Sequence, residues 1–138
     1  ESEKGKFKKA AFEVVSYAKA VADQMGTSVT AVTINAENVE SLGNYGASKV
    51  LSVNNANLDT FNAKQYASVI EQATKQDGGN VVIVSSSADS KYLAPLLAVG
   101  LEAGYVPNVV EAPSSVSFMS TATLEVMYQI FSQVKIVL

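Results

Sequence analysis

The chain has 138 residues, which is the size of a single domain, and a formal net charge of −3. Hydrophobic residues make up 48% of it and charged residues 17%, a balance that can fill a core and argues against a disordered chain. Cysteine and histidine are absent and every basic residue is a lysine, which excludes disulfides, thiolate and imidazole chemistry, and metals held by Cys or His.

The lysines do not indicate nucleic acid as a partner. They are scattered along the chain, with one local cluster at Lys4, Lys6, Lys8 and Lys9, and acidic residues outnumber them by 13 to 10. A nucleic-acid-binding domain normally gathers an excess of basic charge on one face. No apolar run reaches the roughly 20 residues that span a bilayer, so we expect a soluble domain without membrane insertion.

The first half of the chain predicts alternating helices and strands. Apolar residues recur at helical spacing over residues 7–25 and predict an amphipathic helix, which Gly26 is placed to end. The apolar and β-branched residues Val29–Ile34 predict a strand covered on both faces. A short helix around Val39–Leu42 and a glycine-containing turn then lead to a predicted strand at Lys49–Val53.

The second half continues the alternation. A loop at residues 54–59 precedes an amphipathic helix at residues 63–74. The continuously apolar segment Val81–Val84 is the predicted central strand, since a strand in the middle of a parallel sheet is buried on both faces. A helix at Ser90–Ala103 and a strand at Val109–Ala112 are expected to follow.

The C-terminal part of the chain, Ser117–Leu138, is open to two interpretations. We favour strands at Thr121–Val126 and Val134–Leu138, which are rich in β-branched and apolar residues. A helix is the alternative, because four large side chains also share one face at helical spacing: Leu124, Met127, Tyr128 and Phe131.

Alternating strands and helices predict an α/β fold. We expect one domain over residues 1–138, in three layers, with a mostly parallel sheet and helices on both faces. The architecture is Rossmann-like, of the adenine-nucleotide-hydrolase type. Such folds normally open with a strand, whereas the polar run Glu1–Lys6 leads directly into a helix with a sheet-facing apolar stripe. We therefore expect that a leading strand is missing and that it leaves a gap at the centre of the sheet.

The turn from Ser85 to Lys91 is the segment best placed to bind a ligand. Ligands of open α/β sheets bind at the carboxyl ends of strands, where a helix N-terminus and a lysine suit a phosphate, so Ser87, Ser90 and Lys91 are candidate anion or nucleotide ligands. The turn contains no glycine, however, and Asp89 would repel an anion. Ser87, Asp89 or Ser90 serves equally well as a helix N-cap, which is the interpretation we favour.

No catalytic residue and no metal ligand is predicted. Ser85–Ser87 have no histidine to activate them, Lys91 alone is weak support for a Ser–Lys pair, and the carboxylates show no pairing typical of a catalytic dyad. A serine hydrolase is therefore a remote alternative. Lys49, beside Tyr45 and Gly46, could contact an anion, but a turn before a strand explains these residues more simply.

Four segments, in this order, form a combination that points to one family. Gly5–Ala10 leading into Ser16–Ala20 is similar to that family's first helix, which follows a short strand. The sequence Tyr-Gly-Ala-Ser-Lys-Val at Tyr45–Val50 resembles its Tyr-Gly-Ala-Asp-Lys-Val turn. Leu93–Pro95 resembles part of a helix start, and Gly104–Val109 stands where a similar step occurs. Together they resemble the N-terminal domain of the alpha subunits of electron transfer flavoproteins.

Two positions depart from this pattern. Ser90 stands where the family has a glycine before the lysine, and Leu96 stands where it has an arginine after the proline. Any contact that this arginine makes in relatives is therefore absent here. The segment after Ser117 matches the family poorly.

The resemblance implies a heterodimeric FAD-containing carrier in the bacterial cytoplasm. Such a carrier takes electrons from dehydrogenases, typically acyl-CoA dehydrogenases, and passes them to a quinone oxidoreductase or another acceptor. FAD lies mainly on a C-terminal domain of the alpha subunit, so we expect no flavin and no catalytic activity on this chain alone. The domain would pack against the beta subunit as a scaffold, and the isolated chain could form a homodimer. The interface candidates are Tyr45, Lys49, Lys91, Tyr92 and Pro95.

An alternative function is a nucleotide-binding module similar to universal stress proteins. It would bind AMP or ATP at the turn from Ser85 to Lys91. A saturable rise in thermal stability with added nucleotide would favour this alternative over a scaffold.

Overall fold

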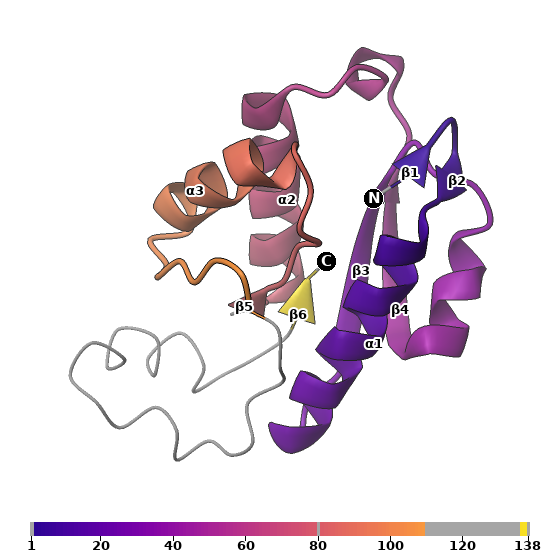
Figure 1. Ribbon diagram of the computed structural model, residues 1–138, viewed down its shortest axis with the longest axis vertical. Coiled ribbons are helices and arrows are strands. Elements are labelled where there is room, and N and C mark those ends of the chain that lie inside the picture. Colours follow the sequence, from indigo (N-terminus) through magenta and orange to yellow (C-terminus); the bar gives the residue numbers. More distant parts are fainter. Residues whose placement is uncertain (1, 80, 110–135, 138) are drawn as a thin grey trace.

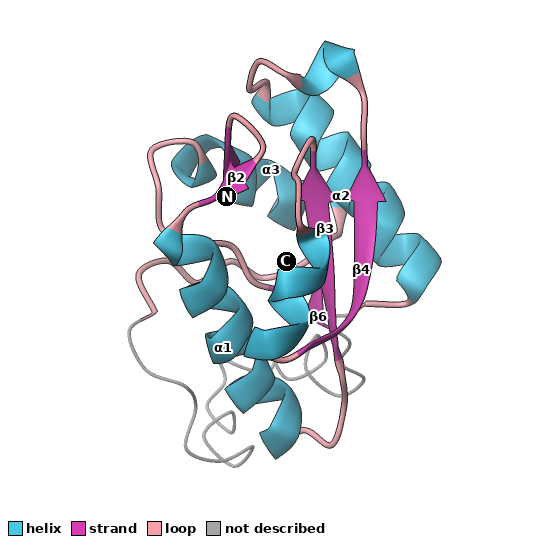
Figure 2. Ribbon diagram, turned by 90° about the vertical axis from the view of Figure 1, so that its right-hand side faces the viewer, coloured by secondary structure: helices cyan, strands magenta, loops and turns pink. Residues whose placement is uncertain are grey.

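Helices and strands alternate in the computed structural model, which describes residues 2–79, 81–109 and 136–137. In chain order the elements are β1 (Ser2–Glu3), β2 (Lys6–Phe7), α1 (Lys9–Gln24), β3 (Val29–Ile34), the 3₁₀ helix η1 (Val39–Tyr45), β4 (Ala47–Val53), the 3₁₀ helix η2 (Ala56–Leu58), α2 (Ala63–Asp77), β5 (Val81–Val82), α3 (Ser90–Gly100) and β6 (Ile136–Val137). Strands β3 to β6 form one parallel sheet in the order β4-β3-β6-β5. Figure 2 shows β3 and β4 side by side with their arrowheads at the same end.

Helices cover both faces of this sheet (Figure 1). On one face, α1 and η1 share a core cluster of Val15 and Leu42 with Ala31 of β3. On the other face, α2 and α3 share a cluster in which Ile70 packs with Val32 of β3. Because successive side chains of a strand point to opposite faces, neighbouring residues of β3 belong to different layers. The three-layer α/β architecture expected from the sequence is confirmed.

The first predicted helix is confirmed as α1. Five of its side chains are buried at the predicted spacing: Ala11, Val15, Ala18, Val21 and Ala22. Full burial of one valine of this kind stabilises the fold by about 1.5–3 kcal/mol. Gly26 follows the helix with a φ of +64°, a conformation that glycine adopts without a Cβ clash.

Three predicted strands differ in how they match the structure. β3 has the predicted bounds, and β4 begins two residues before the predicted Lys49. The predicted central strand Val81–Val84 is too long, because β5 comprises only Val81 and Val82, and β5 lies at the edge of the strands that the structure describes. Its apolarity has another cause: Val81 packs with α1 on one face, and Val82 with α2 and α3 on the other.

The remaining predicted elements agree in part. The short helix around Val39–Leu42 is the longer η1, the second helix extends to Asp77, and α3 ends at Gly100 rather than Ala103. Val109 is not in a strand, and 110–112 lie outside the described residues. The same holds for Thr121–Val126, whereas Val134–Leu138 contains the described strand β6.

The sequence predicted that the start of the chain leads directly into a helix, and this prediction is wrong. Strands β1 and β2 form an antiparallel hairpin, separate from the main sheet, in which Glu3 pairs with Lys6. The two turn residues, Lys4 and Gly5, have positive φ angles of 49° and 79°, as a tight type I′ hairpin turn requires. The carbonyl of Gly5 accepts a hydrogen bond from the Glu37 N–H at 2.7 Å, which ties the hairpin to the segment after β3.

The expected gap at the centre of the sheet is only partly filled. β6 lies between β3 and β5 and pairs with the first two residues of each: Val29 and Thr30, and Val81 and Val82. Among the described residues, β3 has no partner strand on this side beyond Thr30. The leading strand itself stays a prediction.

Gly46, in the turn between η1 and β4, lies very close to α1. Its φ is +113°, and a Cβ added there would lie 2.6 Å from the Cβ and Cγ atoms of Lys19. This is far inside van der Waals contact and involves the inner atoms of the lysine side chain. Only glycine therefore fits both the backbone conformation and the space.

We expect Gly46→Ala to lower the free energy of unfolding by about 1–3 kcal/mol, because it adds both backbone strain and a steric clash. Gly43→Ala in η1 is the matched control, since a Cβ there meets nothing within 4 Å. Urea unfolding of the two variants measures the difference. Equal stability of the two alanine variants would show that the turn can move away from α1.

Candidate functional site

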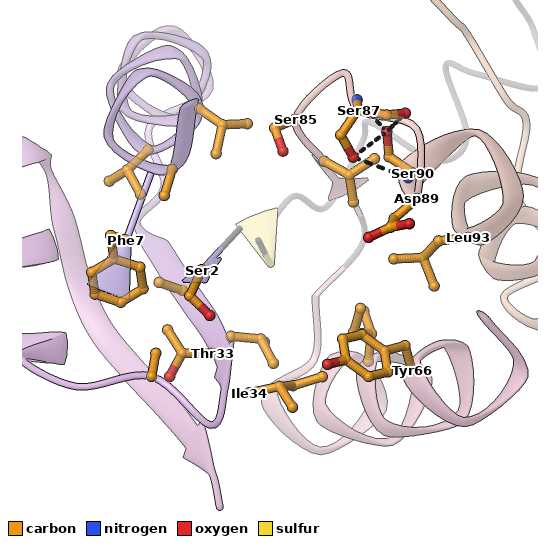
Figure 3. A pocket seen from close by; sticks show the side chains of 18 of the residues that line it. Ser2, Phe7, Thr33, Ile34, Tyr66, Ser85, Ser87, Asp89, Ser90 and Leu93 are labelled. Atoms are coloured by element: carbon orange, nitrogen blue, oxygen red, sulfur yellow. Dashed lines mark hydrogen bonds between the residues drawn. The ribbon is translucent and has the colours of Figure 1, made fainter. Parts of the chain in front are cut away.

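A cavity among the described residues lies at the carboxyl end of β3 and beside the segment that follows β5. Its volume is about 260 Å³. Figure 3 shows side chains from both sides of the sheet around it, including Phe7 and Thr33 on one side and Tyr66 and Leu93 on the other. This is the sheet edge at which open α/β folds bind ligands.

Ser87 and Ser90, two of the candidate anion ligands, bind each other. The Ser87 N–H donates to Ser90 Oγ at 2.7 Å, and the Ser90 N–H donates to Ser87 Oγ at 3.1 Å. The Ser90 hydroxyl also donates to the Ser87 carbonyl at 2.9 Å (Figure 3). These reciprocal bonds satisfy backbone groups at the start of α3, as a helix cap does. Their role as anion ligands stays a prediction.

The third candidate ligand, Lys91, is separated from the cavity. It is exposed on α3 and is not among the lining residues, whereas both Ser87 and Ser90 are. The described lining contains two carboxylates, Asp59 and Asp89, and no lysine. A phosphate or a flavin diphosphate would meet negative charge and no cation here, so the residues present do not fit such a group.

The interface candidates fall into two groups. Lys91, Tyr92 and Pro95 lie together on α3, and all three are exposed. Tyr45 lies at the end of η1, where its ring stacks at 4.5 Å from that of Phe12. Their roles in an interface stay predictions.

Lys49, the other candidate, makes a contact within the fold. Its ammonium lies 2.6 Å from Oδ1 of Asp77, which joins β4 to the last turn of α2. The Asp77 side chain is only 5% exposed, while that of Lys49 is 55% exposed. The lysine thus supplies positive charge to a carboxylate that has lost most of its hydration.

We expect Lys49→Met to lower the free energy of unfolding by about 1–3 kcal/mol, because the buried carboxylate loses this cation. Lys75→Met, at an exposed position of α2, removes the same charge without this contact and is the control. Chemical unfolding at neutral pH distinguishes the two. If Lys49→Met lowers the free energy of unfolding no more than Lys75→Met does, the contact between Lys49 and Asp77 does not stabilise the fold.

Sequence reasoning missed Asn35, which connects the loops at the carboxyl edge. Its side-chain N–H groups donate to the Asn55 carbonyl at 2.8 Å and to Oδ1 of Asp59 at 2.7 Å. Its side-chain oxygen accepts from the Asn55 N–H at 2.7 Å. Its φ of 48° lies in the left-handed region that asparagine tolerates. An asparagine directly after a β-branched strand was the signal that could have indicated this role.

Tyr66 lies on the cavity wall and has a perturbed ionisation. Its hydroxyl donates to the Leu58 carbonyl at 2.8 Å. Burial raises the pKa of the Tyr66 phenol, and the nearby carboxylates of Asp89 and Asp59 raise it further. The folded protein therefore holds this proton at a pH where the unfolded chain has lost it.

We expect the free energy of unfolding to fall as the pH rises above about 10, because the unfolded chain then releases phenol protons that the folded state retains. Tyr66→Phe should weaken this fall and cost about 1 kcal/mol at neutral pH through the lost hydrogen bond. Urea unfolding at a series of pH values measures both effects, with exposed Tyr92→Phe as the control. An unchanged alkaline slope in Tyr66→Phe would contradict the assignment.

No group of three or more acidic, histidine or cysteine side chains within the described ranges could hold a metal ion. No helix in the part of the chain that the structure describes is both long and apolar enough to cross a membrane.

The parallel sheet with helices on both faces defines an α/β domain of Rossmann-like type. Comparison with known families gives a more specific assignment: the electron transfer flavoprotein domain matches residues 1–136. The chain belongs to the electron transfer flavoprotein domain family.

Named relatives agree with this membership. An electron transfer flavoprotein subunit alpha of Thermoanaerobacterium thermosaccharolyticum is 32% identical over 75% of this chain and 32% of the relative. The subunit alpha of Bacillus subtilis is 27% identical over 78% of this chain and 33% of its own length. An acryloyl-CoA reductase electron transfer subunit beta of Anaerotignum propionicum is 25% identical over 95% and 38%. The chain thus spans about a third of the length of these relatives. No solved structure matches it significantly.

Proposed function

We propose that this chain is the N-terminal subunit-interaction domain of an electron transfer flavoprotein alpha subunit. The intact heterodimer would carry electrons in the cytoplasm from dehydrogenases, such as acyl-CoA dehydrogenases, to a quinone oxidoreductase or another acceptor. Two of the relatives described above are named as alpha subunits. On this proposal the domain holds no flavin and performs no turnover.

The observation that carries the proposal is an apolar stripe on the outer side of α3. It consists of Tyr92, Leu96 and Val99, at positions i, i+4 and i+7, which share one face of a helix. The stripe is exposed, with Tyr92 at 71% and Val99 at 78%. The opposite face of α3 buries Leu93 and Leu97 against α2 and the sheet.

Such a stripe has the composition of a protein interface. One aromatic and two aliphatic side chains lie exposed on consecutive turns of the helix. Exposed apolar side chains that are grouped in this way typically mark a surface that a partner protein covers. Further exposed apolar residues follow α3 in the chain: Tyr105, Val106 and Val109. The beta subunit of the heterodimer is the partner that the family membership suggests for this face. The neighbouring candidates Lys91 and Pro95 would flank the contact.

We expect the double substitution Tyr92→Ser and Val99→Ser, made in the full-length alpha subunit, to weaken its binding to the beta subunit at least roughly tenfold, as loss of a central aromatic anchor does. Affinity co-purification after coexpression gives the first readout, and titration gives the dissociation constant. Gln72→Ser with Gln76→Ser, at exposed positions of α2, is the control pair.

The thermal midpoint should remain the same in both double variants, because none of the four side chains is buried. A folded Tyr92 and Val99 variant that binds the beta subunit with unchanged affinity would contradict the proposal. If the control pair on α2 loses binding to the same extent, the contact with the beta subunit is not specific to the stripe on α3.

A further inference from the structure

A groove runs along β4, the strand at one edge of the main sheet. β4 has β3 on one side and no described strand on the other (Figure 2). The groove lies between β4 and α2 and has a volume of about 370 Å³. We call this surface the β4 groove. Its lining consists of Val50, Leu51, Ser52 and Val53 of β4 with Val69, Gln72, Ala73 and Gln76 of α2.

The outer edge of β4 carries backbone groups that pair with no described residue. The Val53 carbonyl accepts a hydrogen bond from the Asn35 N–H, so the backbone groups of Val53 face β3. Because these directions alternate along a strand, the N–H and C=O groups of Val50 and Ser52 face outward. An edge of this kind pairs readily with another β-strand. The chemistry of the edge therefore indicates an extended backbone as its partner.

The second half of β4 lacks the features by which edge strands avoid such pairing. Soluble proteins protect an edge with charged side chains, prolines or bulges. β4 has one lysine, Lys49, and a register irregularity beside it, both in the first half of the strand. The remaining part, Val50–Val53, contains neither a charge nor a proline.

The absence of charge from the β4 groove favours a second copy of this chain as the partner. All eight lining residues are uncharged, although 17% of the chain is charged. A two-fold axis brings side chains close to their own equivalents, where like charges would repel. Gln72 and Gln76 are exposed amides, which both donate and accept hydrogen bonds and so suit an identical surface. Lys49, next to the groove in sequence, is paired with Asp77 of its own copy.

The sequence of β4 permits antiparallel pairing about a two-fold axis through Leu51. Val50 then lies opposite Ser52 of the second copy, and their outward N–H and C=O groups exchange two hydrogen bonds. The symmetric pair adds two more. Leu51 is on the strand face of Lys49, which contacts α2, so the two Leu51 side chains meet at the axis and enter the groove from both copies. Each Lys49 lies opposite Val53, four residues away from its own equivalent.

We propose that the β4 groove is a self-association site, at which two copies of this chain pair their β4 strands antiparallel across a two-fold axis through Leu51. The contact joins the two main sheets into one continuous sheet. Tyr92, Leu96 and Val99 of the stripe on α3 do not line the groove, so the contact does not depend on the proposed function.

Cysteine cross-linking of the 138-residue chain tests the position of the axis. The chain has no cysteine, so Leu51→Cys introduces its only thiol. Residues directly opposite each other in an antiparallel pair lie within the distance that a disulfide bridges. We expect oxidised Leu51→Cys to give a disulfide-linked dimer on non-reducing gel electrophoresis. Val53→Cys, on the same strand face, is the matched control: its two thiols would lie roughly 14 Å apart along the strand, and we expect at least roughly fivefold less dimer.

Sedimentation equilibrium measures the association itself. We expect the unmodified chain to form a weak dimer, with a dissociation constant on the order of 10 μM. Ser52→Pro removes an outward N–H from each copy and leaves the bonds of β4 to β3 intact, since proline is tolerated where the N–H of an edge strand faces solvent. It should weaken dimerisation at least roughly tenfold. Ser52→Ala keeps the N–H and should dimerise like the unmodified chain.

Three outcomes overturn the proposal. The first is equal cross-linking of the two cysteine variants, which also decides the matter if Ser52→Pro does not fold. The second is a folded Ser52→Pro chain that dimerises as tightly as the unmodified chain, or an unmodified chain that is still a monomer at about 500 μM. The third is protection of the Val50 and Ser52 amides from hydrogen exchange that does not change with protein concentration, because another segment of the same chain would then cover the edge.

Discussion

The parallel pairing of β3 with β4 is the constraint on which the other elements depend. All six residues of β3 pair with β4, and the side chains of β3 alternate between two helical layers. Because a parallel strand needs a crossover to reach its neighbour, this pairing requires η1 on one face and, for the return to β5, α2 on the other. The close approach of Gly46 to Lys19 and the ion pair of Lys49 with Asp77 fix β4 against both layers.

The sequence predicted those elements whose burial pattern repeats over several turns or residues. The bounds of β3 and the buried face of α1 were predictable because β-branched residues and the 3.6-residue period give strong local signals. The position of Val81–Val84 was not, since residues covered by helices on both faces are apolar whether their strand is central or at an edge. The β1–β2 hairpin was missed because its turn depends on a positive φ at Lys4, for which lysine gives no signal.

Side-chain contacts at the candidate site were also predictable only where they depend on residues close in sequence. Ser87 and Ser90 are close in sequence, so a capping role for one of them was predictable from local chemistry, whereas their hydrogen bonds to each other were not predicted. The contacts of Asn35 with Asn55 and of Lys49 with Asp77 join residues 20 and 28 positions apart, which only the tertiary fold brings together. The proposed role as a subunit-interaction domain rests on the stripe on α3, which the fold leaves exposed.

The account of the fold requires that β3 is paired along its whole length with β4, whereas among the described residues only Val29 and Thr30 are paired on its other edge. Amide hydrogen exchange of the unmodified chain, followed by NMR, tests this directly. The amides of Ala31 and Thr33, which point to β4, should be strongly protected, and those of Val32 and Ile34, which point away from β4, should exchange roughly tenfold faster or more. Equal protection of the two sets would contradict the account, because β3 would then be paired along both edges.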